Sequence, residues 1–404
     1  MRKRRLMTQV ENYKHILEKI FHREISFSNN SITNNCIGAL NPENDFHTFR
    51  TNFIERLKRI CEYFKDAPEY LEEIVKTAKQ IGQTKGYKWS GSYSELVALD
   101  YWIQFEDIEN IKFPDRGGVT DYADSIAKQI GQVEIDLDIS LDLHTKKIYT
   151  DVKSLIPTHI ELTDQILNCL KSKTEEQNYL IGIDDISDVD YLKTKKDFIY
   201  ELQSGGLIQK LVECVNKKET ICNFKLQSGT GVTFRIEYPK AGINTVLSTT
   251  RAMEPYKLAI DYKFKILDYY NKLLIDKPSL ITFVVNPWFN KELNISKEFI
   301  KTFYRSLTRR IFIELSKDST DMGTIFPELN NKNIKISDVV SKVSGIIFIN
   351  DNSILKTGKD INDVYIYLNP NATNTVLTRK NFDILNWSTS VKMPYIEDFY
   401  YDNY

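Results

Sequence analysis

Two neighbouring runs of alternating apolar and polar residues constrain the fold of this chain more than any other feature of its sequence. In the first run, 133–143, every second residue is apolar. The second run, 147–155, is rich in residues that favour strands and also alternates. A period of two is typical of a β-strand with one buried face. The polar segment 144–147 gives the chain a place to reverse, so the sequence predicts an antiparallel hairpin.

The alternation also predicts which residues of the hairpin lie opposite one another. A loop of two or four residues centred on 145–146 places Asp138 opposite Lys153. Ser140 then lies opposite Asp151, and the two apolar sets share the other face of the hairpin. A three-residue loop would turn Asp151 toward the apolar face, where a carboxylate is costly to bury. The sequence therefore predicts that Asp138, Asp151 and Lys153 cluster on one polar face.

Two carboxylates beside an ammonium group can support the hydrolysis of a phosphate ester. Mg²⁺ prefers oxygen ligands, and it commonly takes one or two carboxylates while keeping several waters. A bound metal lowers the pKa of a coordinated water and stabilises negative charge on a phosphate. A lysine can orient or deprotonate the attacking water and offset that charge. Asp138, Asp151 and Lys153 are therefore candidate catalytic residues, and the two aspartates are candidate metal ligands.

The same three residues resemble the signature of the PD-(D/E)XK nuclease superfamily, which has the restriction-endonuclease-like fold. That signature is an acidic residue in one strand followed by (D/E)-x-K in the next, here Asp138 and Asp151-Val152-Lys153. The spacing is similar to that of archaeal Holliday-junction resolvases. The chain departs from the pattern in two ways, because no proline precedes Asp138 and because aspartate stands where glutamate is commoner.

The resemblance implies a fold, a cofactor and roles for individual residues. The fold would be α/β (α+β), with a mixed sheet flanked by helices in a restriction-endonuclease-like core. Asp138, Asp151 and the backbone carbonyl of Val152 would hold Mg²⁺, with Mn²⁺ as a substitute, and Lys153 would position or activate the water. The family often adds an acidic residue on the helix before the hairpin. Glu95 occupies that place, which makes it a further candidate for the catalytic and metal site.

Purely structural explanations compete with these roles. An acidic outer face is ordinary for an amphipathic hairpin in an antiparallel sheet. The sequence Ser92-Tyr93-Ser94-Glu95 matches a capping box, in which the glutamate satisfies a backbone N–H at the start of a helix. Both interpretations of Glu95 stay open, and they exclude each other only if the helix begins at Ser92.

Periodicity along the rest of the chain divides it into three regions. Residues 1–84 have helical spacing and form an N-terminal helical region. Residues 85–240 would form the nuclease core with an extension, in which a helix at 163–177 and a strand at 178–183 follow the hairpin. Residues 250–404 alternate between helices and strands and form a C-terminal α/β region. This region is either a domain of its own or an extension of the nuclease sheet.

Charge and cysteine content narrow the classes of function. The formal net charge is −1, so the chain has no global basic field and any DNA-binding surface must be local. Arg305 and Arg309 lie one turn apart in a predicted helix, where they could grip phosphate or pair with local carboxylates; we favour the ion pairs. The five cysteines are dispersed without a C-x-x-C pair, which favours a reducing, cytoplasmic setting. No apolar run is long enough to span a membrane.

The sequence as a whole predicts a Mg²⁺-dependent DNA endonuclease that acts in restriction, phage defence or DNA repair. DNA is the predicted partner, and both a homo-oligomer and a partner protein of a defence system are compatible with the sequence. Two alternatives remain: a non-catalytic nucleic-acid-binding or assembly module with a nuclease-like fold, and an RNA nuclease. The complete Asp–Asp–Lys set counts against the first, and no RNA-recognition signature supports the second.

Overall fold

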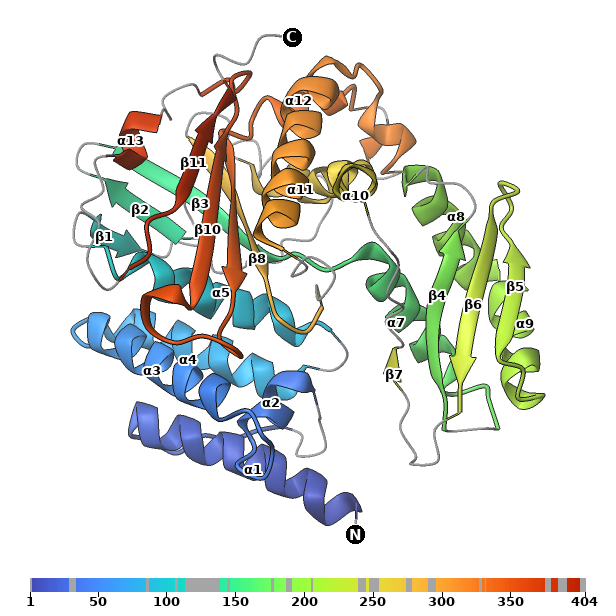
Figure 1. Ribbon diagram of the computed structural model, residues 1–404, viewed down its shortest axis with the longest axis horizontal. Helices are drawn as coiled ribbons and strands as arrows, with labels where there is room; N and C mark the ends of the chain where they lie inside the picture. The colour runs from blue at the N-terminus through green and yellow to red at the C-terminus, as the bar shows by residue number, and fades with distance from the viewer. Residues whose placement is uncertain are drawn as a thin grey trace.

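The computed structural model is a mixed α/β structure (Figure 1). The residues that it describes are 2–28, 34–84, 87–105, 108–112, 139–143, 146–175, 178–186, 191–204, 206–238, 245–246, 254–273, 278–289, 296–326, 329–330, 332–374, 379–383 and 391–399. Within these ranges, no helix combines the length and the apolar character needed to cross a membrane.

A seven-stranded mixed sheet forms the centre of the structure. Its strands, in spatial order, are β1 (Ile108–Lys112), β2 (Ile139–Leu143), β3 (Lys146–Ser154), β8 (Ser279–Val285), β9 (Gly345–Asp351), β10 (Asn362–Leu368) and β11 (Tyr395–Asp398). β3, β8 and β9 are parallel to one another, whereas β1, β2 and β3 form an antiparallel meander. Every residue of β8 and β9 is buried, as expected for parallel strands covered on both faces.

Helices cover both faces of this sheet (Figure 1). One layer consists of α1 (Arg2–Phe21), α2 (Asn35–Leu40), α3 (His47–Tyr63), α4 (Pro68–Gln83) and α5 (Trp89–Trp102). The other contains α10 (Pro255–Tyr262), the 3₁₀ helix η1 (Lys263–Lys272), α11 (Lys297–Arg309), the π-helical turn η3 (Arg310–Glu314) and α12 (Ile336–Val340). Shorter elements are η4 (Leu315–Lys317), η5 (Met322–Thr324), η7 (Gly358–Asp360) and α13 (Arg379–Asp383).

The alternation of side chains along β8 shows how the two cores are divided. Leu280 and Val284 pack in the core on the α5 side of the sheet. Ile281 and Phe283 pack in the core on the α10–α11 side. Successive side chains of a strand point to opposite faces, so each central strand contributes to both cores.

A second, four-stranded sheet lies between β3 and β8 in the chain. Its strands, in spatial order, are β5 (Ile221–Lys225), β6 (Gly231–Glu237), β4 (Leu180–Ile186) and β7 (Thr245–Val246). It has its own hydrophobic core, to which α7 (Thr158–Leu170), α8 (Tyr191–Ser204) and α9 (Gly206–Asn216) contribute. We call residues 158–246 the inserted unit.

The inserted unit corrects one expectation from the sequence. The strand predicted at 178–183 exists as β4, but it lies in the second sheet and not beside the hairpin. The strands of the predicted 85–240 core therefore belong to two sheets, and β8–β11 of the 250–404 region extend the sheet of the hairpin. The physical reason is the apolar content of the strands. β8 and β9 are apolar on both faces and suit the centre, whereas β4 carries two aspartates and needs only the one face that α7–α9 cover.

The hairpin forms as β2 and β3, but its register differs from the prediction. Ser140 pairs with Tyr149 and not with Asp151, a displacement of two residues along β3. β2 ends at Leu143 and β3 begins at Lys146, so the chain reverses one residue earlier than expected. This register pairs residue 142 with residue 147. A displacement of two keeps the predicted alternation of faces.

A fully buried arginine joins the first helical layer to the centre of the sheet. The guanidinium of Arg56 in α3 lies 3.4 Å from Asp100 of α5 and 3.3 Å from Asp351 at the end of β9, and all three side chains are fully buried. Arg56 also donates to the Tyr93 hydroxyl, and Arg59 donates twice to Asp100. Burial, and next the charge of Asp351, raises the pKa of Tyr93 well above its usual value, so its hydroxyl stays a neutral donor.

The Arg56 cluster gives the first prediction. Arg56→Met leaves two buried carboxylates without their shared cation, so we expect a loss of about 3–5 kcal/mol in the free energy of unfolding. Lys58→Met is the matched control, because Lys58 is on the same helix and its ion pair with Glu55 is exposed. Its loss should stay below about 1 kcal/mol. Denaturant unfolding of both variants measures the difference, and equal losses would contradict the role of the cluster.

Tight packing at the start of β9 gives the second prediction. A Cβ at Gly345 would lie 2.9 Å from the carbonyl oxygen of Tyr367 and 3.0 Å from a methyl group of Leu280. Gly345→Ala should therefore lower the free energy of unfolding by about 1–3 kcal/mol through overpacking. Gly38 in α2 has nothing within 4 Å of the same position, so Gly38→Ala should raise stability by up to about 1 kcal/mol. Denaturant unfolding measures both changes in the free energy of unfolding.

Candidate active site

The central strand β3 presents Asp151 and Lys153 on one face of the sheet. Val152 between them packs in the core on the α5 side, whereas Leu155 packs in the core on the α10–α11 side. Because side chains alternate along a strand, Asp151 and Lys153 share the face of Leu155. The ammonium group of Lys153 lies 5.7 Å from the ring centroid of Tyr269 in η1. The pair therefore lies under the second helical layer.

Asp151 is a buried carboxylate with an unusual environment. Its side chain is 4% exposed, and Oδ1 lies 3.0 Å from Nζ of Lys153 in an ion pair. The angles do not make this contact a hydrogen bond, and neither carboxylate oxygen has a hydrogen-bond partner in the part of the chain that the structure describes. Buried polar atoms almost always have such partners, and a carboxylate without them is costly. An unsatisfied buried group of this kind calls for an explanation, and a bound ion or a catalytic role is one that fits a carboxylate.

The neighbouring residues hold the end of β3 in place. Asn286, which follows β8, donates from its amide to Ser154 Oγ at 3.2 Å. Its side-chain oxygen accepts from the backbone N–H groups of Trp288 and Phe289. β3, β8 and β9 are parallel and end at the same edge, which is where open α/β sheets commonly bind their ligands. Asp151 and Lys153 lie in the last half of β3, close to that edge.

A second lysine, which sequence reasoning missed, fixes the exit of the chain from β3. Lys265 of η1 is 2% exposed and donates to the backbone carbonyl of Ile156 and to Glu161 at 3.1 Å. Burying an ammonium group requires such partners. Lys265 and Tyr269 lie more than a hundred residues from β3 in the sequence, and no local motif marks them. The one available signal for Lys265 is its position on the apolar side of a predicted helix, where a lysine is unusual.

Asp138, the first acidic residue of the predicted signature, lies outside the described residues. Its covalent neighbour Ile139 opens β2 and pairs with Thr150. The predicted pairing of Asp138 with Lys153 belongs to the register that Ser140 and Tyr149 contradict.

Glu95 does not join Asp151 and Lys153. It lies on α5, which packs on the opposite face of the sheet, with Val152. Thr77 of α4 donates to the Glu95 carboxylate at 3.4 Å, so Glu95 lies between the two helices. The capping-box interpretation is also wrong, because α5 begins at Trp89 and not at Ser92. The position of Glu95 in the sequence did not show which face of the sheet its helix would cover.

The described residues contain no group of three or more histidine, cysteine, aspartate or glutamate side chains placed to hold a metal ion. Among them, Asp151 has the chemistry that Mg²⁺ requires, since its hard carboxylate oxygens accept no hydrogen bond in this part of the chain. The Val152 carbonyl is its neighbour in the backbone. A complete ligand set would have to include Asp138.

A stability comparison tests whether Asp151 is kept for function. Asp151→Asn removes a buried charge that accepts no hydrogen bond in the described structure, so the free energy of unfolding should change by no more than about 1 kcal/mol. Asp100→Asn is the matched control, because Asp100 is also buried and accepts from Arg56 and Arg59. It should cost about 3–5 kcal/mol. Similar losses for the two variants would make Asp151 a structural residue.

Comparisons with known proteins do not place the chain in a family: no protein-family model, no curated protein and no solved structure matches it.

Proposed function

We propose that this protein is a metal-dependent nuclease that hydrolyses phosphodiester bonds in DNA at a site built around Asp151 and Lys153. One observation carries the proposal. A buried carboxylate whose oxygens accept no hydrogen bond within the described structure lies 3.0 Å from a lysine, in a D-x-K sequence on a central strand. Such a pair is costly to bury, and metal-assisted phosphate hydrolysis uses both of its members.

The order of the elements supports a restriction-endonuclease-like core. The resemblance implies a helix, a strand and a hairpin, followed by a further helix and strand. α5, β1, β2 and β3 come in that order, and α10, η1 and β8 come after the inserted unit. β8 lies beside β3 and parallel to it. In this proposal the inserted unit interrupts the core between the hairpin and the next helix.

The roles of the residues follow from their placement. Asp151, the Val152 carbonyl and Asp138 would hold Mg²⁺, which when bound supplies positive charge at the phosphate and lowers the pKa of a coordinated water. Lys153 would donate hydrogen bonds to the attacking water and offset charge on the phosphate. Its side chain is 15% exposed, so it can meet a substrate while Asp151 stays buried. The ring of Tyr269 makes a cation–π contact with the ammonium group of Lys153.

Cleavage assays test this proposal directly. Purified protein should cleave plasmid DNA with Mg²⁺ or Mn²⁺, and a chelator should abolish the reaction. Asp138→Asn, Asp151→Asn and Lys153→Ala should each reduce the rate at least about 100-fold, the scale of a lost general acid–base or charge-stabilising group. Lys65→Ala should cleave at the normal rate, because Lys65 is an exposed residue of the loop after α3 that pairs with Glu62.

Other outcomes point to other functions. Full activity in the chelator would contradict the metal, and full activity of Asp151→Asn would contradict the site. Cleavage of RNA alone would make the protein an RNA nuclease. A folded protein that binds DNA and never cuts it, with either metal, would be a non-catalytic binding module.

A further inference from the structure

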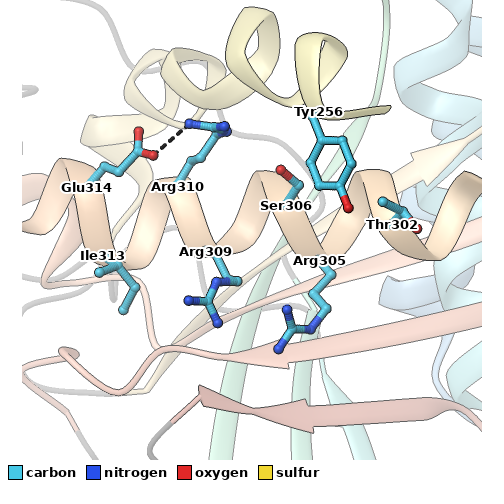
Figure 2. Close-up of a pocket in the computed structure, with 8 residues that line it drawn as sticks. All are labelled: Tyr256, Thr302, Arg305, Ser306, Arg309, Arg310, Ile313 and Glu314. Carbon is cyan, nitrogen blue, oxygen red and sulfur yellow. Dashed lines mark hydrogen bonds and ion pairs between the residues drawn. The ribbon is translucent and has the colours of Figure 1, made fainter. Parts of the chain in front are cut away.

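A pocket of about 440 Å³ lies across the outer face of α11, beside α10 (Figure 2). Three arginines line it, Arg305, Arg309 and Arg310, together with the hydroxyl groups of Tyr256, Thr302 and Ser306. Figure 2 shows Arg305 and Arg309 extending to one side of α11 and Arg310 to the other. Its volume is in the range of pockets that bind small molecules or parts of larger ones.

Carboxylates and an aromatic ring hold the arginines in place. Arg305 donates from Nε to Glu397 of β11 at 2.7 Å, so it does form an ion pair, but with a carboxylate 92 residues away in the sequence and not with a local one. The guanidinium carbons of Arg305 and Arg309 lie 5.7 and 5.9 Å from the ring centroid of Phe399. A guanidinium that is already oriented loses less entropy when it binds an anion.

Arg310 has donor capacity that its ion pair with Glu314 does not use. One terminal nitrogen donates to Glu314 at 2.6 Å. Its Nε atom is buried and makes no hydrogen bond within the described ranges, although the side chain as a whole is 25% exposed. A buried donor without an acceptor is costly, whereas the exposed part of the guanidinium is open to an anion in the pocket that Arg310 lines. Among the described lining residues, three arginines stand against one carboxylate, Glu314, and Glu397 pairs with Arg305, so the balance of these groups is still positive.

Basic residues continue along α11 beyond the pocket. Lys297, Lys301, Arg305 and Arg309 recur every four residues, so they follow one side of the helix. At 1.5 Å per residue they extend over about 18 Å, which is longer than one small anion requires. Lys301 lies 4.0 Å from the ring centroid of Tyr395, so an aromatic contact orients this residue too.

The pocket also lies in the helical layer that covers the candidate active site. Tyr256 is on α10, and α10 continues directly into η1, whose Tyr269 lies over Lys153. We propose that the pocket binds a backbone phosphate of nucleic acid and that α11 is part of the surface along which DNA reaches Asp151 and Lys153. The identity of the polymer rests on the proposed function, whereas the phosphate chemistry rests on the pocket itself.

DNA binding at different salt concentrations tests the proposal. The measurement is fluorescence anisotropy of a labelled DNA duplex in the Asp151→Asn background without divalent metal, so that cleavage does not interfere. Arg309→Gln with Arg310→Gln should weaken binding about tenfold at low salt and make the dependence of log Kd on log[salt] shallower by about 1–2. Arg309→Lys with Arg310→Lys keeps the charge and should keep most of the slope. Lys65→Gln removes one positive charge from an exposed site outside the pocket and should change neither quantity.

Each result decides the proposal. Unchanged affinity and slope in the double glutamine variant, with melting curves like those of the parent, would overturn it. An equal loss in Lys65→Gln would overturn it too, because the effect would then come from net charge. If inorganic phosphate raises the melting temperature through Arg309 and Arg310 but DNA binding does not depend on them, the ligand is a small anion. That result would overturn the assignment to nucleic acid.

The experiments distinguish a wrong assignment of the pocket from a wrong proposed function. Binding that depends on the two arginines, in a protein whose parent form never cuts DNA, would retain the pocket and remove the nuclease. Cleavage that is normal in the arginine variants at low salt, with unchanged binding, would retain the nuclease and remove the pocket.

Discussion

The shared burial of Arg56 with Asp100 and Asp351 is the interaction on which the arrangement of the layers depends. It brings together α3, α5 and the end of β9, segments that are separated by up to 295 residues in the sequence. Apolar packing alone would tolerate small shifts of the helices over the sheet, whereas a guanidinium between two carboxylates accepts few positions. The cluster therefore fixes where α5 lies on the sheet. Since α5 packs against β3 and β8, it also fixes one side of the strand that carries Asp151.

The period of the sequence predicted the hairpin and its faces, because alternation in β2 and β3 is a local property. It did not predict the register, since the sequence between the two runs has none of the Asn-Gly or Asp-Gly signals that specify a two-residue turn. The order of the predicted elements also led us to place β4 in the sheet of the hairpin. Which strand lies beside β3 is decided by apolar content on both faces, and β8 satisfies that condition from far along the chain. Sequence order favoured the nearer strand.

The candidate site likewise combines residues that the sequence marks locally with residues that only the fold brings together. The D-x-K triplet is local and could be read from the sequence, whereas Tyr269 and Lys265 reach β3 only through the fold. Glu95 illustrates the opposite case, because its position before the hairpin suggested a site to which the fold does not bring it. Within the described part of the chain, Asp151 also departs from the rule that buried polar groups are satisfied. Sequences usually agree with their structures at every level, and departures of this kind concentrate where binding or catalysis requires them.

The inserted unit has a consequence for how the chain folds. β3 and β8 are neighbours in the sheet, yet the contact between Thr150 and Thr282 spans 132 residues. During synthesis the hairpin therefore emerges long before the strand that completes its other edge. An unpaired apolar edge can associate with other chains, and contacts between distant residues form slowly. The inserted unit has its own core and can become compact in that interval, which brings the two ends of the interruption closer together. Destabilising the inserted unit should therefore lower the yield of folded protein more than its own loss of stability would suggest.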